Sequence, residues 1–153
     1  MSVVVVTRFR VARPRHVAPF LAASLRAAVQ ARGAAGARRV EVYAQSGSVY
    51  WTLTEWEHGR DVRAYRDAST HGRIMQHTDG WASEALVVRW RHHDESPPRL
   101  SDVAEHRHHA VFLPLTSPSA DHAAGRFDVP TARMRLVFRS RSAAGSLDEL
   151  LAG

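Results

Sequence analysis

A histidine with three neighbours at helical spacing is the first candidate for chemistry in this chain. On one helix, Ala64, Ala68, His71 and Met75 share a stripe, because they follow one another at steps of four, three and four residues. Two alanines beside a histidine leave room for a small molecule. His71 in such a pocket is suited to general-base catalysis, because its ordinary pKa is near neutral. The alternative is a structural histidine that packs against a sheet.

Large aromatic side chains and an arginine surround this stripe in the sequence. The aromatic residues can form a flat pocket whose indole N–H groups orient a ring, or they can fill the core or a subunit interface. Arg89 could stabilise an enolate or phenolate, or lie in solvent at a strand end. The residues that we predict to bind a substrate are Trp51, Trp56, Tyr65, Met75, Trp81 and Arg89.

The sequence lacks the residues that several other kinds of site require. The chain has no cysteine, which excludes disulfides, thiolate-bound zinc and a cysteine nucleophile. No glycine-rich phosphate loop or nucleophile elbow occurs, so nucleotide-dependent chemistry is disfavoured. Six histidines follow residue 91, but a metal site needs three or four ligands in a defined geometry, and we predict no metal. They are His92, His93, His106, His108, His109 and His122.

The charge pattern argues against a nucleic-acid partner. The net charge is +6, and all 21 basic residues are arginine. The arginines are scattered from Arg8 to Arg141 among 15 acidic residues, whereas a nucleic-acid surface concentrates its cations on one face or segment. No stretch approaches the ~20 apolar residues of a membrane span, and the start of the chain lacks the features of a signal peptide. We therefore expect a cytoplasmic protein with no membrane partner.

The first 92 residues predict a ferredoxin-like α+β domain. Apolar alternation indicates strands at 3–11, 38–45, 49–57 and 84–92. Helical spacing indicates a helix at 16–32, and a second at 60–77 that is interrupted near Ser69-Thr70. The apolar face of the first helix is read as Val17, Phe20, Leu21, Leu25, Ala28 and Val29. The order β-α-β-β-α-β is the split βαβ arrangement.

Residues 93–153 predict an extension that packs on the 1–92 domain and is not an independent domain. We expect a short helix at 100–109, a loop at 114–130, an edge strand at 133–139 and a tail at 141–153. Two helices cover only one face of a four-stranded sheet, and both faces contain apolar residues. A second copy of the chain would cover the other face, so we predict a homodimer.

Several segments together are similar to a known family pattern. They are Trp51-Thr-Leu-Thr-Glu-Trp56-Glu, 62–65, Ser69-Thr70-His71-Gly72-Arg73-Ile74-Met75, Trp81, Arg89-Trp90 and Phe112-Leu113-Pro114-Leu115-Thr116-Ser117-Pro118-Ser119. Over roughly residues 2–120 the chain resembles the antibiotic-biosynthesis-monooxygenase-like superfamily, in the branch related to spheroidene monooxygenase. One departure is Gly72-Arg73, where that branch more often has arginine directly after the histidine.

The resemblance implies a dimeric α/β barrel and an oxygenase. The activity it implies is a cofactor-independent monooxygenase, or another tailoring enzyme of secondary metabolism, that acts with dioxygen on a small aromatic or polyketide-like intermediate. His71 is then the base, and no redox cofactor is needed. The alternatives are a cyclase or isomerase in the same pocket, a non-catalytic dimer that binds a small molecule, and a monooxygenase that binds haem through a histidine.

Overall fold

The first 92 residues form the β-α-β-β-α-β order that their apolar patterns predict. In the computed structural model, which describes residues 1–45, 48–112 and 134–139, a short 3-10 helix, η1 (Pro14–His16), precedes the first α-helix. The elements are β1 (Ser2–Val11), α1 (Val17–Gly33), β2 (Ala37–Gln45), β3 (Val49–Trp56), α2 (Gly59–Asp67), α3 (Ser69–Trp81) and β4 (Ala82–His92). None of the described helices is long and apolar enough to cross a membrane.

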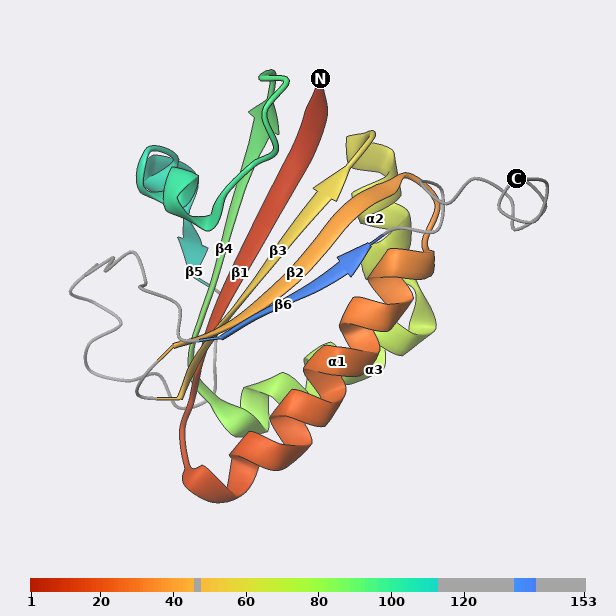
Figure 1. Cartoon of the computed structure of the whole chain (residues 1–153). Helices are drawn as coiled ribbons and strands as arrows, with labels where there is room; N and C mark the ends of the chain where they lie inside the picture. The colour runs from red at the N-terminus through yellow and green to blue at the C-terminus, as the bar shows by residue number, and fades with distance from the viewer. Residues whose placement is uncertain (46–47, 113–133, 140–153) are drawn as a thin grey trace, which may run out of the picture.

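The strands form one antiparallel sheet in the order β5-β4-β1-β3-β2-β6. Its central four strands have the ferredoxin-like order, and the three α-helices lie on one side of it (Figure 1). The edge strand predicted at 133–139 is confirmed as β6 (Met134–Arg139), beside β2. The short β5 (Val111–Phe112), beside β4, escaped prediction because two residues show no alternation. The loop predicted at 114–130 and the tail predicted at 141–153 lie outside the described residues.

The second helical region is broken into α2 and α3, as the sequence predicts. Ala68, between them, has the extended dihedrals φ −61° and ψ 135°. The single stripe of Ala64, Ala68, His71 and Met75 is therefore wrong, because a helical stripe requires unbroken helical geometry; Ala64 is exposed. The short helix expected at 100–109 is instead two 3-10 helices, η2 (Leu100–Ala104) and η3 (Arg107–His109).

The sheet-facing side of α1 is built from small residues. Phe20, Ala28 and Ala31 are its buried positions. Leu25 is 39% exposed and Val29 is 61% exposed, so the prediction that they face inward is wrong. One helix turn takes 3.6 residues, and the stripe that starts at Phe20 meets Ala28 and Ala31 while the larger side chains fall outside it.

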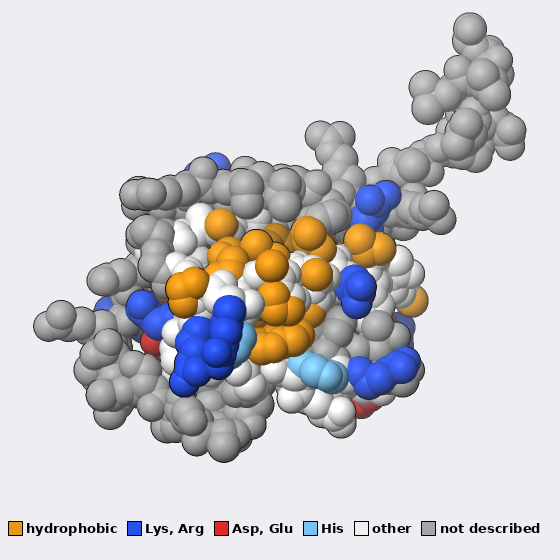
Figure 2. Space-filling model, turned by 90° about the horizontal axis from the view of Figure 1, so that it is seen from below, with side chains coloured by type: hydrophobic (Ala, Val, Ile, Leu, Met, Phe, Trp, Pro, Cys, Tyr) orange, Lys and Arg blue, Asp and Glu red, His pale blue; other side chains and the backbone are white. Residues whose placement is uncertain are grey.

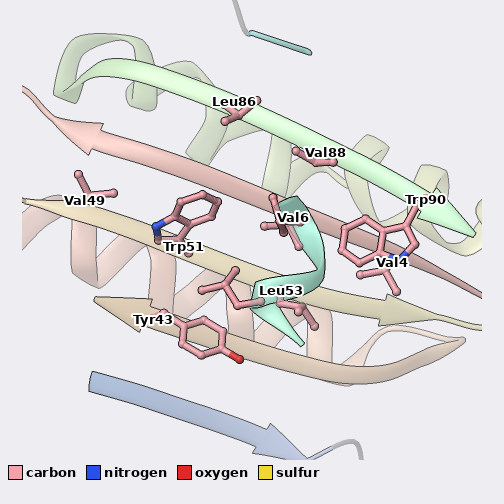
Figure 3. Close-up of a cluster of buried hydrophobic side chains, with 11 residues drawn as sticks. Val4, Val6, Tyr43, Val49, Trp51, Leu53, Leu86, Val88 and Trp90 are labelled. Carbon is pink, nitrogen blue, oxygen red and sulfur yellow. The ribbon is translucent and has the colours of Figure 1, made fainter. Parts of the chain in front are cut away.

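The sheet face away from the α-helices holds the larger apolar cluster. Trp51, Leu53, Val88 and Trp90 are 0–4% exposed, and Leu100 and Val103 of η2 belong to the same cluster. Figure 3 shows the side chains of the strand residues, among them Trp51, Leu53 and Trp90, on the sheet face away from the α-helices. The chain thus covers this face itself, and the premise of a bare face behind the predicted homodimer is wrong. The homodimer remains a prediction.

Truncating Leu100 tests the contribution of η2 to this cluster. Leu100→Ala is expected to lower the free energy of unfolding by about 2–4 kcal/mol, because it opens a cavity in a packed core. Leu25→Ala, at an exposed position of α1, is the matched control and is expected to change it by under about 0.5 kcal/mol. Chemical denaturation measures both. Equal effects would show that η2 does not hold the core.

Candidate functional site

A cavity of about 530 Å³ lies between the sheet and the three α-helices. It exists because both walls carry short side chains where a packed core has long ones. The helix-facing side chains of β1 and β3 include Thr7, Thr52 and Thr54, and α1 contributes alanines and a serine. The α1 residues that line the cavity are Phe20, Ala23, Ser24, Ala27, Ala28 and Ala31. The apolar walls suit a small organic ligand.

An aromatic wall closes one side of the cavity. The ring centroid of Tyr65 is 5.1 Å from that of Trp56 and 4.6 Å from that of His71. The Tyr65 hydroxyl donates a hydrogen bond of 3.0 Å to the carbonyl oxygen of Ala27 in α1. Burial raises the pKa of Tyr65 to about 12, so its hydroxyl keeps its proton. Tyr65 therefore fixes α2 against α1 and presents a neutral ring to the cavity.

The start of α2 is fixed by contacts that place Tyr65. The backbone N–H of His58 donates a hydrogen bond of 3.0 Å to Oδ2 of Asp61, as in a capping box. Asp61 also packs against Gly36, whose φ of +75° favours glycine. A Cβ at position 36 would come within 2.2 Å of the Asp61 carboxylate, so only glycine allows this approach. Tyr65 lies one turn further along the helix.

His71 is a half-buried imidazole that lines the cavity from α3. Its Nδ1 is shielded from solvent and has no hydrogen-bond partner among the described residues. Burial, and then the nearby charge of Arg66, lower the pKa of His71, so the ring is neutral at neutral pH. A neutral imidazole has one nitrogen that can accept a proton. His71 is therefore available as a proton acceptor for a bound molecule.

Two arginines line the cavity, and no carboxylate does so among the described residues. Arg89 reaches over from β4 toward Gly59, where a Cβ would lie 2.6 Å from its guanidinium nitrogen. Arg66 pairs with Asp67 at 3.0 Å, in a pair that is largely exposed. Figure 2 shows exposed hydrophobic side chains on the lower end of the molecule, with arginine side chains around them.

The structure brings together five of the seven predicted site residues: Trp56, Tyr65, His71, Trp81 and Arg89 all line the cavity. Trp51 does not. It is 1% exposed on the opposite face of the sheet, in the cluster drawn in Figure 3, so its predicted place in the pocket is wrong. Successive side chains of a strand point to opposite faces, so Trp51 and Trp56 of β3 cannot share one pocket. The side chain of Met75 lies outside the described residues.

Other residues that line the cavity were not predicted, although the sequence pattern around some of them indicated their position. Phe9 alternates with Val5 and Thr7 along β1, and that alternation could have placed all three on the helix side. Phe9 meets Phe20 of α1 edge to face, with ring centroids 5.5 Å apart. No sequence pattern indicated Arg66, because its position at the cavity depends on where α2 ends.

The C-terminal histidines lie away from this cavity. His106 stacks on Trp90, with ring centroids 4.6 Å apart, and the rings of His108 and His109 are 4.0 Å apart. No group of three or more potential metal ligands occurs among the described residues. His122 lies outside them.

Comparisons with known proteins identify the fold. No protein-family model matches the sequence, and no curated protein matches it. Among solved structures, the chain is similar to Rv0793 from Mycobacterium tuberculosis, with 16% identity, a TM-score of 0.59 and coverage of 63% of this chain and 100% of that one. An antibiotic biosynthesis monooxygenase matches with 9% identity, a TM-score of 0.55 and coverage of 60% and 99%. SnoaB, a cofactor-independent oxygenase from Streptomyces nogalater, matches with 15% identity, a TM-score of 0.55 and coverage of 63% and 98%.

The lowered pKa of His71 predicts a pH dependence of stability. The unfolded chain binds the proton near the ordinary value of 6.5, and the folded protein binds it only at lower pH. Stability is therefore fully present above about pH 6.5 and falls as the pH drops toward the folded pKa. The melting temperature of the wild type should fall more between pH 7.5 and 5.5 than that of His71→Gln. His77→Gln, at an exposed position of α3, is the control and should behave as the wild type; equal falls for His71→Gln would contradict the lowered pKa.

Proposed function

We propose that this protein is a monooxygenase-like tailoring enzyme that oxidises a small planar phenol or enol with dioxygen, without a bound redox cofactor. The observation that carries the proposal is His71, a neutral and half-buried base with an unpartnered Nδ1, in a cavity with aromatic and aliphatic walls. A deprotonated phenol or enol is itself electron-rich enough to reduce dioxygen. The protein then has to supply a base, a dry pocket and stabilisation of the anion.

The reaction balances with one dioxygen. His71 removes a proton from the substrate and leaves an enolate or phenolate. The anion transfers an electron to dioxygen, and the resulting radicals combine in a C–O bond, which gives a peroxide. Protonated His71 returns its proton to the peroxide, the O–O bond breaks, and water leaves with the second hydrogen of the same carbon. A methylene group thus becomes a carbonyl group, and one oxygen atom of dioxygen is reduced to water.

The likeness to SnoaB and to an antibiotic biosynthesis monooxygenase supports this class of reaction through the fold alone. The residues of this chain support it independently. The cavity offers a base beside the aromatic wall of Trp56 and Tyr65, against which a planar substrate can stack. Arg89 can stabilise the anion that forms on deprotonation.

Anthrone, a three-ring compound with an acidic methylene group, is a direct probe of the activity. The protein is expected to convert it to anthraquinone with uptake of one dioxygen per product. His71→Ala should lower the rate by roughly 100-fold, the scale of losing a general base. His77→Ala, on the same helix but outside the cavity, should leave the rate unchanged. An oxygen electrode and the absorbance of anthraquinone measure the two sides of the reaction.

The melting temperature of His71→Ala separates catalysis from packing. A structural histidine would lower stability by about 1–3 kcal/mol on truncation, through a cavity and unpaired polar groups. The imidazole of His71 makes no hydrogen bond through Nδ1, so we expect folding to be nearly intact. A strongly destabilised variant, or a wild-type rate without His71, would contradict the role of a base. Product formed without dioxygen uptake would indicate a cyclase or isomerase.

The absorption spectrum of the purified protein tests the absence of a redox cofactor from the reaction. We expect a colourless protein that oxidises anthrone at full rate after dialysis against a chelator. A Soret band that disappears in His71→Ala would establish the haem alternative and contradict the proposal.

A further inference from the structure

The cavity between the sheet and the helices has a one-sided charge. Its charged lining residues are Arg66 and Arg89, with His71 between apolar walls, and none of its described lining residues is acidic. The hydroxyls of Thr7, Thr52 and Thr54 add hydrogen-bond capacity but no negative charge. A cavity lined by one sign of charge attracts ligands of the opposite sign, because its low-dielectric walls focus the field.

Arg89 is an exposed cation at the rim of the cavity, with no carboxylate partner among the described residues. It makes no hydrogen bond or ion pair with any residue that the structure describes, although it rises from the middle of β4 beside Val5. Its guanidinium is held next to Gly59, which has no side chain to exclude it. A side chain at position 59 would have to displace that guanidinium. The glycine therefore leaves room for a positive charge at the cavity.

The nearby acids are already engaged elsewhere. Asp61 accepts a hydrogen bond from the backbone of His58, and its carboxylate packs on Gly36. Asp67 pairs with Nε of Arg66 and does not line the cavity. On the opposite face of the sheet, the buried Arg8 pairs with Glu84. The exposed Arg89 has no carboxylate partner among the described residues.

We propose that the cavity binds an anionic planar ligand, whose carboxylate pairs with Arg89, assisted by Arg66, while its ring lies against Trp56 and Tyr65. This inference deepens the proposed function, on whose site it rests: it makes the substrate class an aromatic acid. A guanidinium matches a carboxylate through two parallel N–H···O bonds, and such charge-assisted bonds are stronger than neutral ones. The carboxylate is distinct from the group that His71 deprotonates.

Two ligands that share a ring system but differ in the charge of one polar substituent test this proposal. Anthracene-9-carboxylate and anthracene-9-methanol have the same three rings, and both are fluorescent. Titration of the wild-type protein at pH 7.5 should give at least a roughly 10-fold lower Kd for the carboxylate, the scale of a hydrogen bond to a charged group. The preference should shrink as the salt concentration rises, because salt screens partly exposed charges.

Variants locate the preference at Arg89. Arg89→Gln should weaken binding of the carboxylate roughly 10-fold or more and leave binding of the alcohol within about two-fold. Arg91→Gln removes the same charge two residues along β4, outside the cavity, and should leave the preference intact. Gly59→Ala keeps the charge but displaces the guanidinium, and should also weaken carboxylate binding. Gly80→Ala, where an added Cβ meets nothing within 4 Å, is its control.

The outcomes separate this inference from the proposed function. Equal affinity for the two ligands, or an equal loss of both in Arg89→Gln, would overturn the anionic ligand, even if anthrone is oxidised. A carboxylate preference that depends on Arg89 supports the inference even if no dioxygen is consumed, in which case only the proposed reaction fails. A preference that survives Arg89→Gln but not Arg91→Gln would overturn the placement of the carboxylate.

Discussion

Both faces of one sheet are buried in this protein, and that constraint governs everything else. In β1, Val4 and Val6 point to one face and are 0–1% exposed, while Val5 and Thr7 point to the other and line the cavity. Because successive side chains of a strand point to opposite faces, a one-residue shift of register would exchange the two sets. The two faces differ in packing: Trp51, Leu53 and Trp90 fill the face away from the α-helices, whereas threonines and alanines leave a cavity beside Trp56 on the face toward them. The packed face away from the α-helices stabilises the fold, and the face toward them leaves room for a ligand.

Tyr65 connects the elements that surround the cavity. The Tyr65 hydroxyl is bonded to the backbone of α1, and its ring contacts Trp56 on the sheet side and His71 on α3. Burial keeps that hydroxyl neutral, so the bond holds across the range of pH in which His71 titrates. The break at Ala68 turns α3 away from the line of α2, which lets His71 reach the same cavity from a second helix.

Ion pairing also differs between the two faces. On the face away from the α-helices, Arg8 pairs with Glu84, and Arg39 pairs with Glu41 at 2.5 Å. On the face toward the helices, Arg89 has no such partner among the described residues, and Arg66 has only the exposed Asp67. Arg66 and Arg89 are both exposed, so their guanidinium groups stay hydrated in the empty protein and accessible to a bound anion. The helix side of the sheet therefore favours an anionic ligand, as we propose.

The sequence by itself determined the elements of the first 92 residues and their order, because apolar alternation and helical spacing are local properties of the chain. It also predicted Trp56, Tyr65, His71, Trp81 and Arg89 as a group, and these residues do line one cavity. Tertiary structure decided the rest. Trp51 lies on the wrong face for the cavity, because alternation within β3 separates it from Trp56. Leu25 and Val29 face solvent, because the stripe of α1 that meets the sheet depends on how the helix packs, not on which residues are apolar. Leu100 and Val103 pack into the cluster on the face that seemed to need a second subunit. Contacts between segments far apart in the sequence cannot be predicted from the apolar periodicity of either segment.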